Sequence, residues 1–201
     1  MFTGILSDKG KVQVIFKKND GIVLEIQTVL VDEIRAGQSI LINGVRLLVY
    51  NSSGKSINML LPNSIASKTN LKNLYVGSFV NIELALRLSD RLSGTIIYGK
   101  IRGIVRVIEV TKFGINFNVW YEVPSELMRY LIKDGNIALN GISHIIDDLH
   151  TNHIMVSFTP FIWNQTIAHS QTVGNEVNLE IDPNALLVTS YLDRYFTSHL
   201  K

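Results

Sequence analysis

The sequence predicts an all-β protein with two six-stranded antiparallel barrels of the Greek-key type in tandem, followed by a C-terminal helix. Three observations lead to this prediction. The two halves of the chain repeat each other at one constant offset, and short segments of both halves alternate between apolar and polar residues. The last segment of the chain carries an apolar stripe with helical spacing.

The repeat has an offset of 97 residues, which places Asn43-Gly44 on Asn140-Gly141. At the same offset VGSFVNIE, residues 76–83, falls on VGNEVNLE, residues 173–180. Single matches between these blocks keep the offset too: Ile65 with Ile162, and Thr69 with Thr166. An offset that survives several separated blocks without a gap indicates an internal duplication, and such a repeat decides the fold.

Each half is dominated by short segments in which every second residue is apolar. The clearest examples are residues 22–26 and 115–121, with Ile22, Leu24 and Ile26 in the first and Ile115, Phe117, Val119 and Tyr121 in the second. This pattern is typical of half-buried antiparallel strands. About six strands per half leave sheet edges exposed, and closing each sheet into a small barrel hides them. We therefore expect barrels at residues 1–92 and 93–182.

Few helices are expected. Pro124-Ser125-Glu126 is a favourable helix start that leads toward an end at Gly135, and residues 31–34 indicate a weaker helical turn. Residues 183–201 form the clearest helix, with a stripe made of Val188, Tyr191, Leu192, Tyr195 and Phe196. The stripe needs a surface to cover it, either the same stripe on other copies of the chain or the chain's own barrel.

Composition narrows the class of protein. Of the 201 residues, 46% are hydrophobic and only 18% are charged, which is typical of a well-packed globular protein. No apolar run is long enough to span a membrane, and the first residues do not resemble a signal peptide. The net charge of +2 is spread along the chain, so neither nucleic acid nor membrane is expected as a partner. Cysteine is absent, and a cytoplasmic location is the expectation.

Taken together, these residues resemble a known family. Met1-Phe2-Thr3-Gly4-Ile5, the Asn-Gly strand in each half, the repeated Val-Asn-x-Glu and the final helix are similar to riboflavin synthase of the alpha type. The resemblance covers essentially the whole chain. It implies a dismutation of two 6,7-dimethyl-8-ribityllumazine molecules, in which a four-carbon unit is transferred to give riboflavin and a ribitylamino-pyrimidine.

The resemblance also implies an assembly. The family uses no metal or cofactor, and it forms homotrimers held together by the C-terminal helices. Each active site lies between the first barrel of one subunit and the second barrel of its neighbour. This arrangement would explain the duplication, because two identical heterocycles must be held face to face by two related walls. A cluster of metal-capable side chains in a turn, formed by Asp147, Asp148, His150 and His153, does not change the expectation of no metal.

The residues that differ from the family pattern are those expected to contact the ligand, whereas the scaffold residues persist. Arg46 and Leu48 stand where Cys and Thr are usual, and His144 and Ile145 replace Leu and Thr. The family's Gly-His-Val-Asp-Gly is here Gly99-Lys100-Ile101-Arg102-Gly103, so Lys100 replaces a histidine. The remaining changes put Ile65 and Ile162 in place of Thr, and Asn164 in place of an acidic residue.

From the resemblance, we expect catalytic roles for Lys100 and Ser143. Substrate contacts are expected from Phe2, Thr3, Gly4, Ile5, Arg46, Leu47, Leu48, Leu61, Pro62, Ser64, Ile65, Gly99, Lys100, Ile101, Asp134, Ser143, His144, Ile145, Thr159, Pro160, Ile162 and Asn164. Arg46 either turns outward into water or points into the cleft, where its guanidinium would require an anion. Three functional interpretations follow: an active riboflavin synthase, a non-catalytic lumazine or flavin binder like the lumazine proteins, and a scaffold without a ligand.

Overall fold

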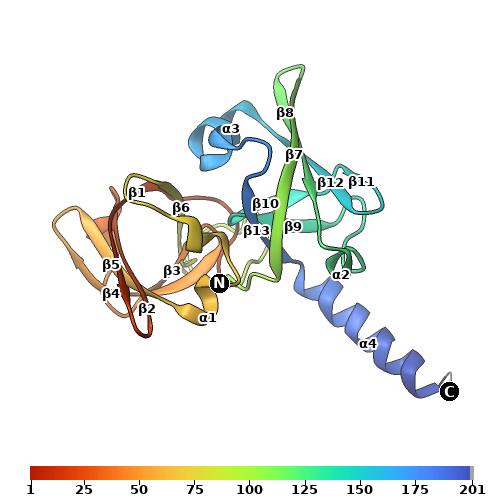
Figure 1. Ribbon diagram of the computed structural model, residues 1–201, viewed down its shortest axis with the longest axis horizontal. Helices are drawn as coiled ribbons and strands as arrows, with labels where there is room; N and C mark the ends of the chain where they lie inside the picture. Colours follow the sequence, from red (N-terminus) through yellow and green to blue (C-terminus); the bar gives the residue numbers. More distant parts are fainter. Residues whose placement is uncertain (200–201) are drawn as a thin grey trace.

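The computed structural model describes residues 1–199 and contains two β domains side by side, with a helix that projects from the second (Figure 1). The first domain is a closed antiparallel barrel with the strand order β1-β2-β5-β4-β3-β6. Its strands are β1 (Asp8–Lys18), β2 (Gly21–Gln27), β3 (Ser39–Ile42), β4 (Val45–Ser53), β5 (Ser56–Pro62) and β6 (Phe79–Leu84).

The second domain is a curled antiparallel sheet with the order β10-β9-β13-β7-β8-β12-β11. Its strands are β7 (Gly103–Phe113), β8 (Asn116–Glu122), β9 (Asn136–Leu139), β10 (Ile142–Ile145), β11 (Asp148–Leu149), β12 (His153–Phe158) and β13 (Glu176–Ile181). The two edge strands β10 and β11 are separated in the chain by Ile146 and Asp147 alone. At the repeat offset they are the two halves of β4, whose pairing with β5 has a bulge between Val49 and Asn51. The predicted fold class is therefore confirmed, with one strand of the second copy interrupted where the first copy bulges.

Alternate strand residues point into two separate apolar cores, as their period of two predicts. Leu24 and Met59 are fully buried in the first core, and Tyr121 and Phe158 in the second. The hydroxyl of Tyr121 donates to Oε1 of Gln171 at 2.6 Å, so this buried polar group keeps a partner. A third, small cluster combines residues of both halves: Phe2, Leu41, Ile97 and Ala138.

Short helices connect the strands, and one long helix ends the described chain. The helical turns are η1 (Val31–Glu33), α1 (Asn63–Ala66), η2 (Asn70–Asn73), α2 (Ser125–Met128), α3 (Pro160–Gln165) and η3 (Ile167–Ser170). Helix α4 (Pro183–His199) confirms the C-terminal helix, although Leu200 and Lys201 lie outside the described residues. Within residues 1–199, no helix is long and apolar enough to cross a membrane.

The helix expected from Pro124 to Gly135 was predicted too long. Helix α2 ends at Met128, and the chain then continues in single turns, in which Tyr130 and Leu131 donate to the carbonyls of Leu127 and Met128. Leu127 and Leu131 are buried in the core, and Met128 and Tyr130 pack against it, whereas Ile132 is exposed. Residues 132–134 are all exposed, so this part of the segment has little tertiary packing that would extend the helix toward Gly135.

Candidate functional site

The two Asn-Gly turns meet at the contact between the domains. In the first turn Asn43 and Gly44 have φ angles of 47° and 78°, and the second turn has nearly the same angles. Positive φ at both central positions is the geometry that Asn-Gly hairpins favour. Asn43 is also bonded to the last strand of its own domain, because its amide donates to Asn81 O at 3.0 Å and its Oδ1 accepts from Asn81 N at 2.8 Å. Asn140 and Asn178 repeat this pair of bonds in the second domain.

The asparagine of each Val-Asn-x-Glu then binds the turn of the other domain. Asn178 Nδ2 donates to the carbonyl of Asn43 at 2.9 Å, and Asn81 Nδ2 donates to the carbonyl of Asn140 at 3.0 Å. All four side chains are at least 97% buried, which makes these bonds costly to remove. The repeated motifs therefore hold the two domains together through reciprocal hydrogen bonds. We call this set of residues the clasp: Asn43, Asn81, Asn140 and Asn178.

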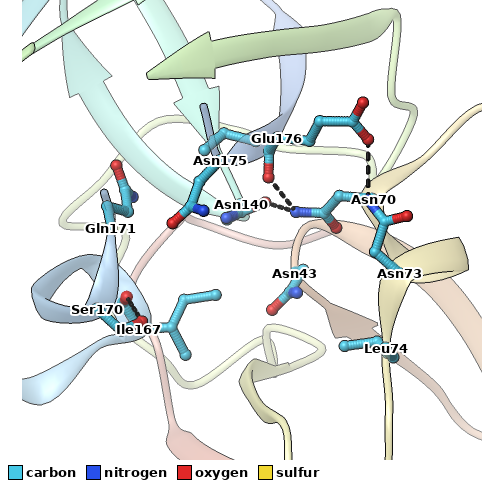
Figure 2. Close-up of a pocket in the computed structure, with 11 residues that line it drawn as sticks. Asn43, Asn70, Asn73, Leu74, Asn140, Ile167, Ser170, Gln171, Asn175 and Glu176 are labelled. Carbon is cyan, nitrogen blue, oxygen red and sulfur yellow. Dashed lines mark hydrogen bonds between the residues drawn. The ribbon is translucent and has the colours of Figure 1, made fainter. Parts of the chain in front are cut away.

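The clasp is asymmetric on one side, where Asn70 of the first domain enters it (Figure 2). Asn70 donates from Nδ2 to Asn140 Oδ1 at 2.9 Å and to the carbonyl of Glu176 at 3.0 Å. The equivalent residue of the second domain is Ile167, which contributes only its backbone amide, to Asn81. An amide-lined cavity of about 190 Å³ lies here, and none of the expected substrate contacts lines it. We assign this region to domain assembly.

Each barrel is preceded by an irregular lead segment, and a buried glutamate holds each segment in place. In the first lead segment (residues 1–7), Glu83 of β6 accepts from the amides of Thr3 at 2.5 Å and Gly4 at 3.1 Å, and from the Thr3 hydroxyl. In the second lead segment (residues 95–102), Glu180 of β13 accepts from the corresponding amides, those of Tyr98, Gly99 and Lys100. The Glu of the repeated motif is therefore the anchor of a lead segment.

Burial raises the pKa of the Glu83 carboxyl to about 7, because loss of hydration outweighs the donors from Thr3 and Gly4. Burial also raises the pKa of Glu180, against the same kind of donors. Both carboxyl groups are acceptors in every bond described above, so their role at these positions is structural.

Each lead segment also forms a hydrogen bond with a strand of the other domain. The carbonyl of Gly4 accepts from the amide of Ser143 on β10 at 3.1 Å, and the carbonyl of Gly99 accepts from the amide of Arg46 on β4 at 3.3 Å. The packing requires glycine, since a Cβ on Gly4 would lie 2.5 Å from the Ser143 Cβ and one on Gly99 would lie 2.6 Å from the Arg46 Cβ. Each lead segment thus lies against a strand of the other domain: the first against β10 and the second against β4.

The first half-site, as we define it, consists of Arg46 and Leu48 on β4, Gly99–Ile101 and the end of β5 with its turn, Leu61–Ile65. Strands β4 and β5 are paired only as far as Val49 and Met59. Beyond this pair the two strands separate, and β5 continues to Pro62. The amide edge of β4 is taken up instead by the second lead segment, and Ile101 packs against the first core. Leu48 is 56% exposed. The first half-site therefore has an exposed apolar side chain beside strand edges, which is a surface suited to a flat ligand.

The second half-site has the same plan with different residues: Ser143 and Ile145 on β10, Gly4–Leu6, and Thr159–Asn164. Leu6 packs against the second core, as Ile101 does in the first, and Ile145 is 57% exposed. Thr159 is the N-cap of α3 and accepts from the amide of Ile162. Between the separated strands, the carboxylate of Asp147 accepts from the amide of Ser157 at 2.6 Å.

An aromatic cluster lies beneath the second half-site and has no counterpart in the first. Trp163 stacks on Phe117 with ring centroids 4.5 Å apart and meets Phe158 edge to face. His144 packs against Phe158 at 4.4 Å, and its Nε2 has no hydrogen-bond partner. Complete burial lowers the pKa of His144 to about 4, so this ring is neutral at physiological pH.

The expected substrate contacts divide between these half-sites. Gly4 and Ser143 come together in the second, and Arg46, Gly99 and Ile101 come together in the first. Thr3 is buried beside the second half-site, where its amide and hydroxyl donate to Glu83. The side chains of Leu47, Leu61 and His144 are inside the cores, so a ligand reaches only their backbone. Phe2 lies in the cluster between the domains, and Asp134 lies in an exposed turn at φ 64°. The exposed or partly exposed residues that remain are Ile5, Pro62, Ser64, Ile65, Pro160, Ile162 and Asn164.

Lys100 and Ser143, the expected catalytic residues, belong to different half-sites of one chain. Ser143 is partly exposed on β10, beside Gly4. The side chain of Lys100 lines a cavity of about 360 Å³ with Glu180 and the start of α4. Within residues 1–199 no group of three or more His, Cys, Asp or Glu side chains is arranged to hold a metal ion.

Sequence reasoning missed the roles of Asn81, Asn178, Glu83 and Glu180, although all four lie in the repeated Val-Asn-x-Glu. Their repetition was the available signal: a buried polar residue that recurs in both copies at the same strand position needs a partner in both.

Comparison with known proteins agrees with this architecture. The family model for the lumazine binding domain matches residues 3–85 and 98–182. Riboflavin synthase of Actinobacillus pleuropneumoniae is 31% identical over 97% of this chain and 89% of its own length. Riboflavin synthase of Escherichia coli (strain K12) is 30% identical over 96% of this chain and 92% of its own length.

Among solved structures, LumP complexed with riboflavin has a TM-score of 0.85 and 25% identity, covering 90% of this chain and 100% of LumP. LumP complexed with 6,7-dimethyl-8-(1'-D-ribityl) lumazine has a TM-score of 0.82 and 26% identity, covering 90% and 99%. With its duplicated barrels, its paired half-sites and relatives that align over nearly their full length, the chain belongs to the riboflavin synthase family of proteins with two lumazine-binding domains.

Proposed function

We propose that this protein is a riboflavin synthase that dismutates two molecules of 6,7-dimethyl-8-ribityllumazine. The observation that carries the proposal is the equivalence of the two half-sites. The bond from Arg46 N to Gly99 O recurs as the bond from Ser143 N to Gly4 O, with a buried glutamate behind each lead segment. A dismutation uses two identical heterocycles, whereas a simple binder needs only one such site.

The chemistry relies on positioning more than on side-chain nucleophiles. The C7 methyl group of one lumazine must lose a proton, and the resulting carbanion must attack the second lumazine. Backbone groups hold the rings where β4 separates from β5 and where β10 separates from β12. Correct positioning of the two bound reactants supplies a large part of the rate enhancement. Ser143 contributes a hydroxyl, and the Lys100 ammonium contributes positive charge that stabilises the carbanion.

The active centre is proposed to form between subunits. As the family resemblance implies, the first half-site of one copy would face the second half-site of its neighbour, which would bring Lys100 of one subunit toward Ser143 of the other. The exposed stripe on α4 would join these copies into the homotrimer expected from the family, because both barrels already fill their own cores. All five residues of this stripe are solvent-exposed: Val188, Tyr191, Leu192, Tyr195 and Phe196.

The second candidate function is a lumazine or flavin binder without catalysis. Apolar side chains favour it, because Leu48 and Ile145 project from the two half-sites where hydroxyl groups would assist the reaction. LumP, which is similar over nearly its full length, has been solved with a lumazine, with riboflavin and with flavin mononucleotide.

One experiment separates the candidates. The full-length protein is mixed with 6,7-dimethyl-8-ribityllumazine, and riboflavin formation is followed at an absorbance where flavins absorb and lumazines do not, while ligand fluorescence reports binding. A synthase forms riboflavin above the uncatalysed rate, and Lys100→Met lowers turnover about tenfold, equivalent to about 1.4 kcal/mol. Binding without riboflavin formation would establish the binder, and no binding would exclude both functions.

A further inference from the structure

Arg46 is the side chain that most clearly departs from a simple pteridine site. It projects outward from β4 between two buried neighbours, Val45 and Leu47, and its side chain is exposed. Within residues 1–199 no acidic side chain forms an ion pair with it. Its backbone amide is held by Gly99, so the strand position is fixed while the guanidinium stays available to a ligand.

The Arg46 side chain lines a cavity of about 230 Å³ beside the first half-site. A second guanidinium, that of Arg87, lines the same cavity, with Gln38 and Ser39 providing neutral hydrogen-bonding groups. Arg87 pairs with Glu33 at 3.2 Å, so two guanidinium groups and one carboxylate leave a net charge of +1. A single water occupies about 30 Å³ in the liquid, so the cavity has room for a phosphoryl group with several waters.

The internal repeat provides a reference for this cavity. An equivalent cavity of about 400 Å³ exists in the second domain, lined by Tyr130, Gly135, Asn136 and Asn184. At the repeat offset these residues correspond to Glu33, Gln38, Ser39 and Arg87, and Arg46 corresponds to Ser143. The two copies thus share the cavity, but Arg46 and Arg87 are replaced in the second copy by Ser143 and Asn184. The second cavity has an arginine at another position, Arg129, which is paired with Asp193. Packing of the barrel does not explain Arg46, since the second copy makes the same backbone bond with serine.

We propose that the cavity between Arg46 and Arg87 binds a phosphate monoester, and that the first half-site accepts a ribityl ligand carrying a terminal phosphate. Guanidinium groups suit this class of ligand, because their planar donor arrays match phosphate oxygens and remain charged at all relevant pH values. The second part rests on the proposed flavin or lumazine site, whereas the phosphate site itself does not. The two sources of phosphate, a ribityl phosphate and free inorganic phosphate, are distinguished by separate arms of the test.

The first arm compares riboflavin with riboflavin 5'-phosphate by fluorescence titration. In the unmodified protein the phosphate lowers Kd about tenfold at low salt, and the advantage shrinks in about 0.5 M NaCl because exposed charges are screened. Arg46→Ser, which installs the residue of the second copy, brings the two Kd values within about twofold. Arg87→Asn, the other exchange between copies, reduces the advantage. Lys18→Ser removes the same charge from the hairpin between β1 and β2 and leaves the advantage unchanged.

The second arm follows the ³¹P resonance of inorganic phosphate. The unmodified protein broadens the signal, and Arg46→Ser abolishes the broadening, even if neither flavin binds and the proposed function fails. Broadening without a preference for riboflavin 5'-phosphate would keep the phosphate site and reject its link to the ribityl chain. Absence of both effects, or an advantage that survives Arg46→Ser, overturns the inference.

Discussion

Gly44 and Gly141 meet back to back where the two domains touch. A Cβ placed on Gly44 would lie 2.7 Å from the amide nitrogen of Gly141, and one on Gly141 would lie 2.8 Å from that of Gly44. Both residues also have φ near 80°, where L side chains are strained. The close approach permits the asparagine side chains on either side to reach across the boundary.

The first prediction is that Gly44→Ala and Gly141→Ala each destabilise the protein by about 3 kcal/mol or more. About 1–2 kcal/mol comes from the left-handed backbone, and the remainder from separating the domains. Gly37→Ala measures the first contribution alone, because Gly37 has φ 89° and a Cβ added to it would meet no atom within 4 Å. Urea unfolding of the three variants checks this, and equal losses in all of them would refute a role for close contact.

The second prediction concerns the clasp. Asn178→Ala should cost about 3 kcal/mol and Asn81→Ala about 2 kcal/mol, because removing a buried side chain leaves its former partners unsatisfied. Asn178 makes the greater number of bonds, since its side chain exchanges two with Asn70 in addition to the one that it donates to Asn43. Asn51→Ala, at an exposed position, is the control. Unfolding midpoints that rank Asn81→Ala below Asn178→Ala would contradict the asymmetry seen in the structure.

The fold was predictable from local patterns and from the repeat, whereas the connections between the domains were not. The stripe on α4 repeats every three to four residues, so it is visible in one short window. Asn178 and Asn43 are separated by 135 residues, and nothing near either one indicates its partner. The helix after Pro124 was overpredicted because a favourable start says little about where packing stops.

The candidate site was predictable only as a set of residue types. The family resemblance predicted ligand contacts for Thr3 and Gly99, and the structure bonds Gly99 to the half-site strand β4. It did not indicate that each lead segment binds a strand of the other domain. The hydrogen bonds from Ser143 to Gly4 and from Arg46 to Gly99 use backbone atoms, which carry no sequence signal. It also left the orientation of Arg46 open, and that orientation depends on the alternation along β4.

The third prediction is a pH dependence from His144. Its pKa falls from 6.5 in the unfolded chain to about 4 in the folded protein, so the unfolded state binds a proton first as the pH drops. Stability is therefore unaffected well above pH 6.5, decreases between pH 6.5 and 4, and reaches a deficit of about 3 kcal/mol below that range. His144→Leu, which installs the equivalent residue Leu47, removes this deficit and the unpartnered Nε2.

The difference between the variant and the unmodified protein is the measurement that isolates His144. Glu83 acts in the opposite direction, because its raised pKa adds stability as the pH falls from about 7 to 4.5. Both proteins share that contribution, so it cancels in the difference. Urea unfolding at pH 7.5 and pH 4.5 should show a gain from His144→Leu that is larger by about 2 kcal/mol at the lower pH. A gain independent of pH would show that the ring is not the titrating group.

The last prediction concerns α4, which projects from the second domain (Figure 1). Large apolar side chains along this helix are exposed. Its first turns are attached, since Ala185 and Leu186 pack against the second core and Asp193 pairs with Arg129. Between these contacts Leu187 is 70% exposed and Tyr191 is 69% exposed, although both are large apolar side chains. Burying such side chains against other copies would contribute about 1.5–3 kcal/mol for each one that becomes fully covered.

Tyr191→Asp should therefore convert the expected homotrimer into monomers, while the two barrels keep their unfolding midpoint. Thr197→Asp adds the same charge to the opposite side of the helix and should leave the assembly intact. Light scattering coupled to size-exclusion chromatography gives the mass of each protein. Riboflavin formation by a monomeric Tyr191→Asp variant at the unmodified rate would contradict an active centre shared between subunits, because a monomer can supply only the half-sites of a single chain.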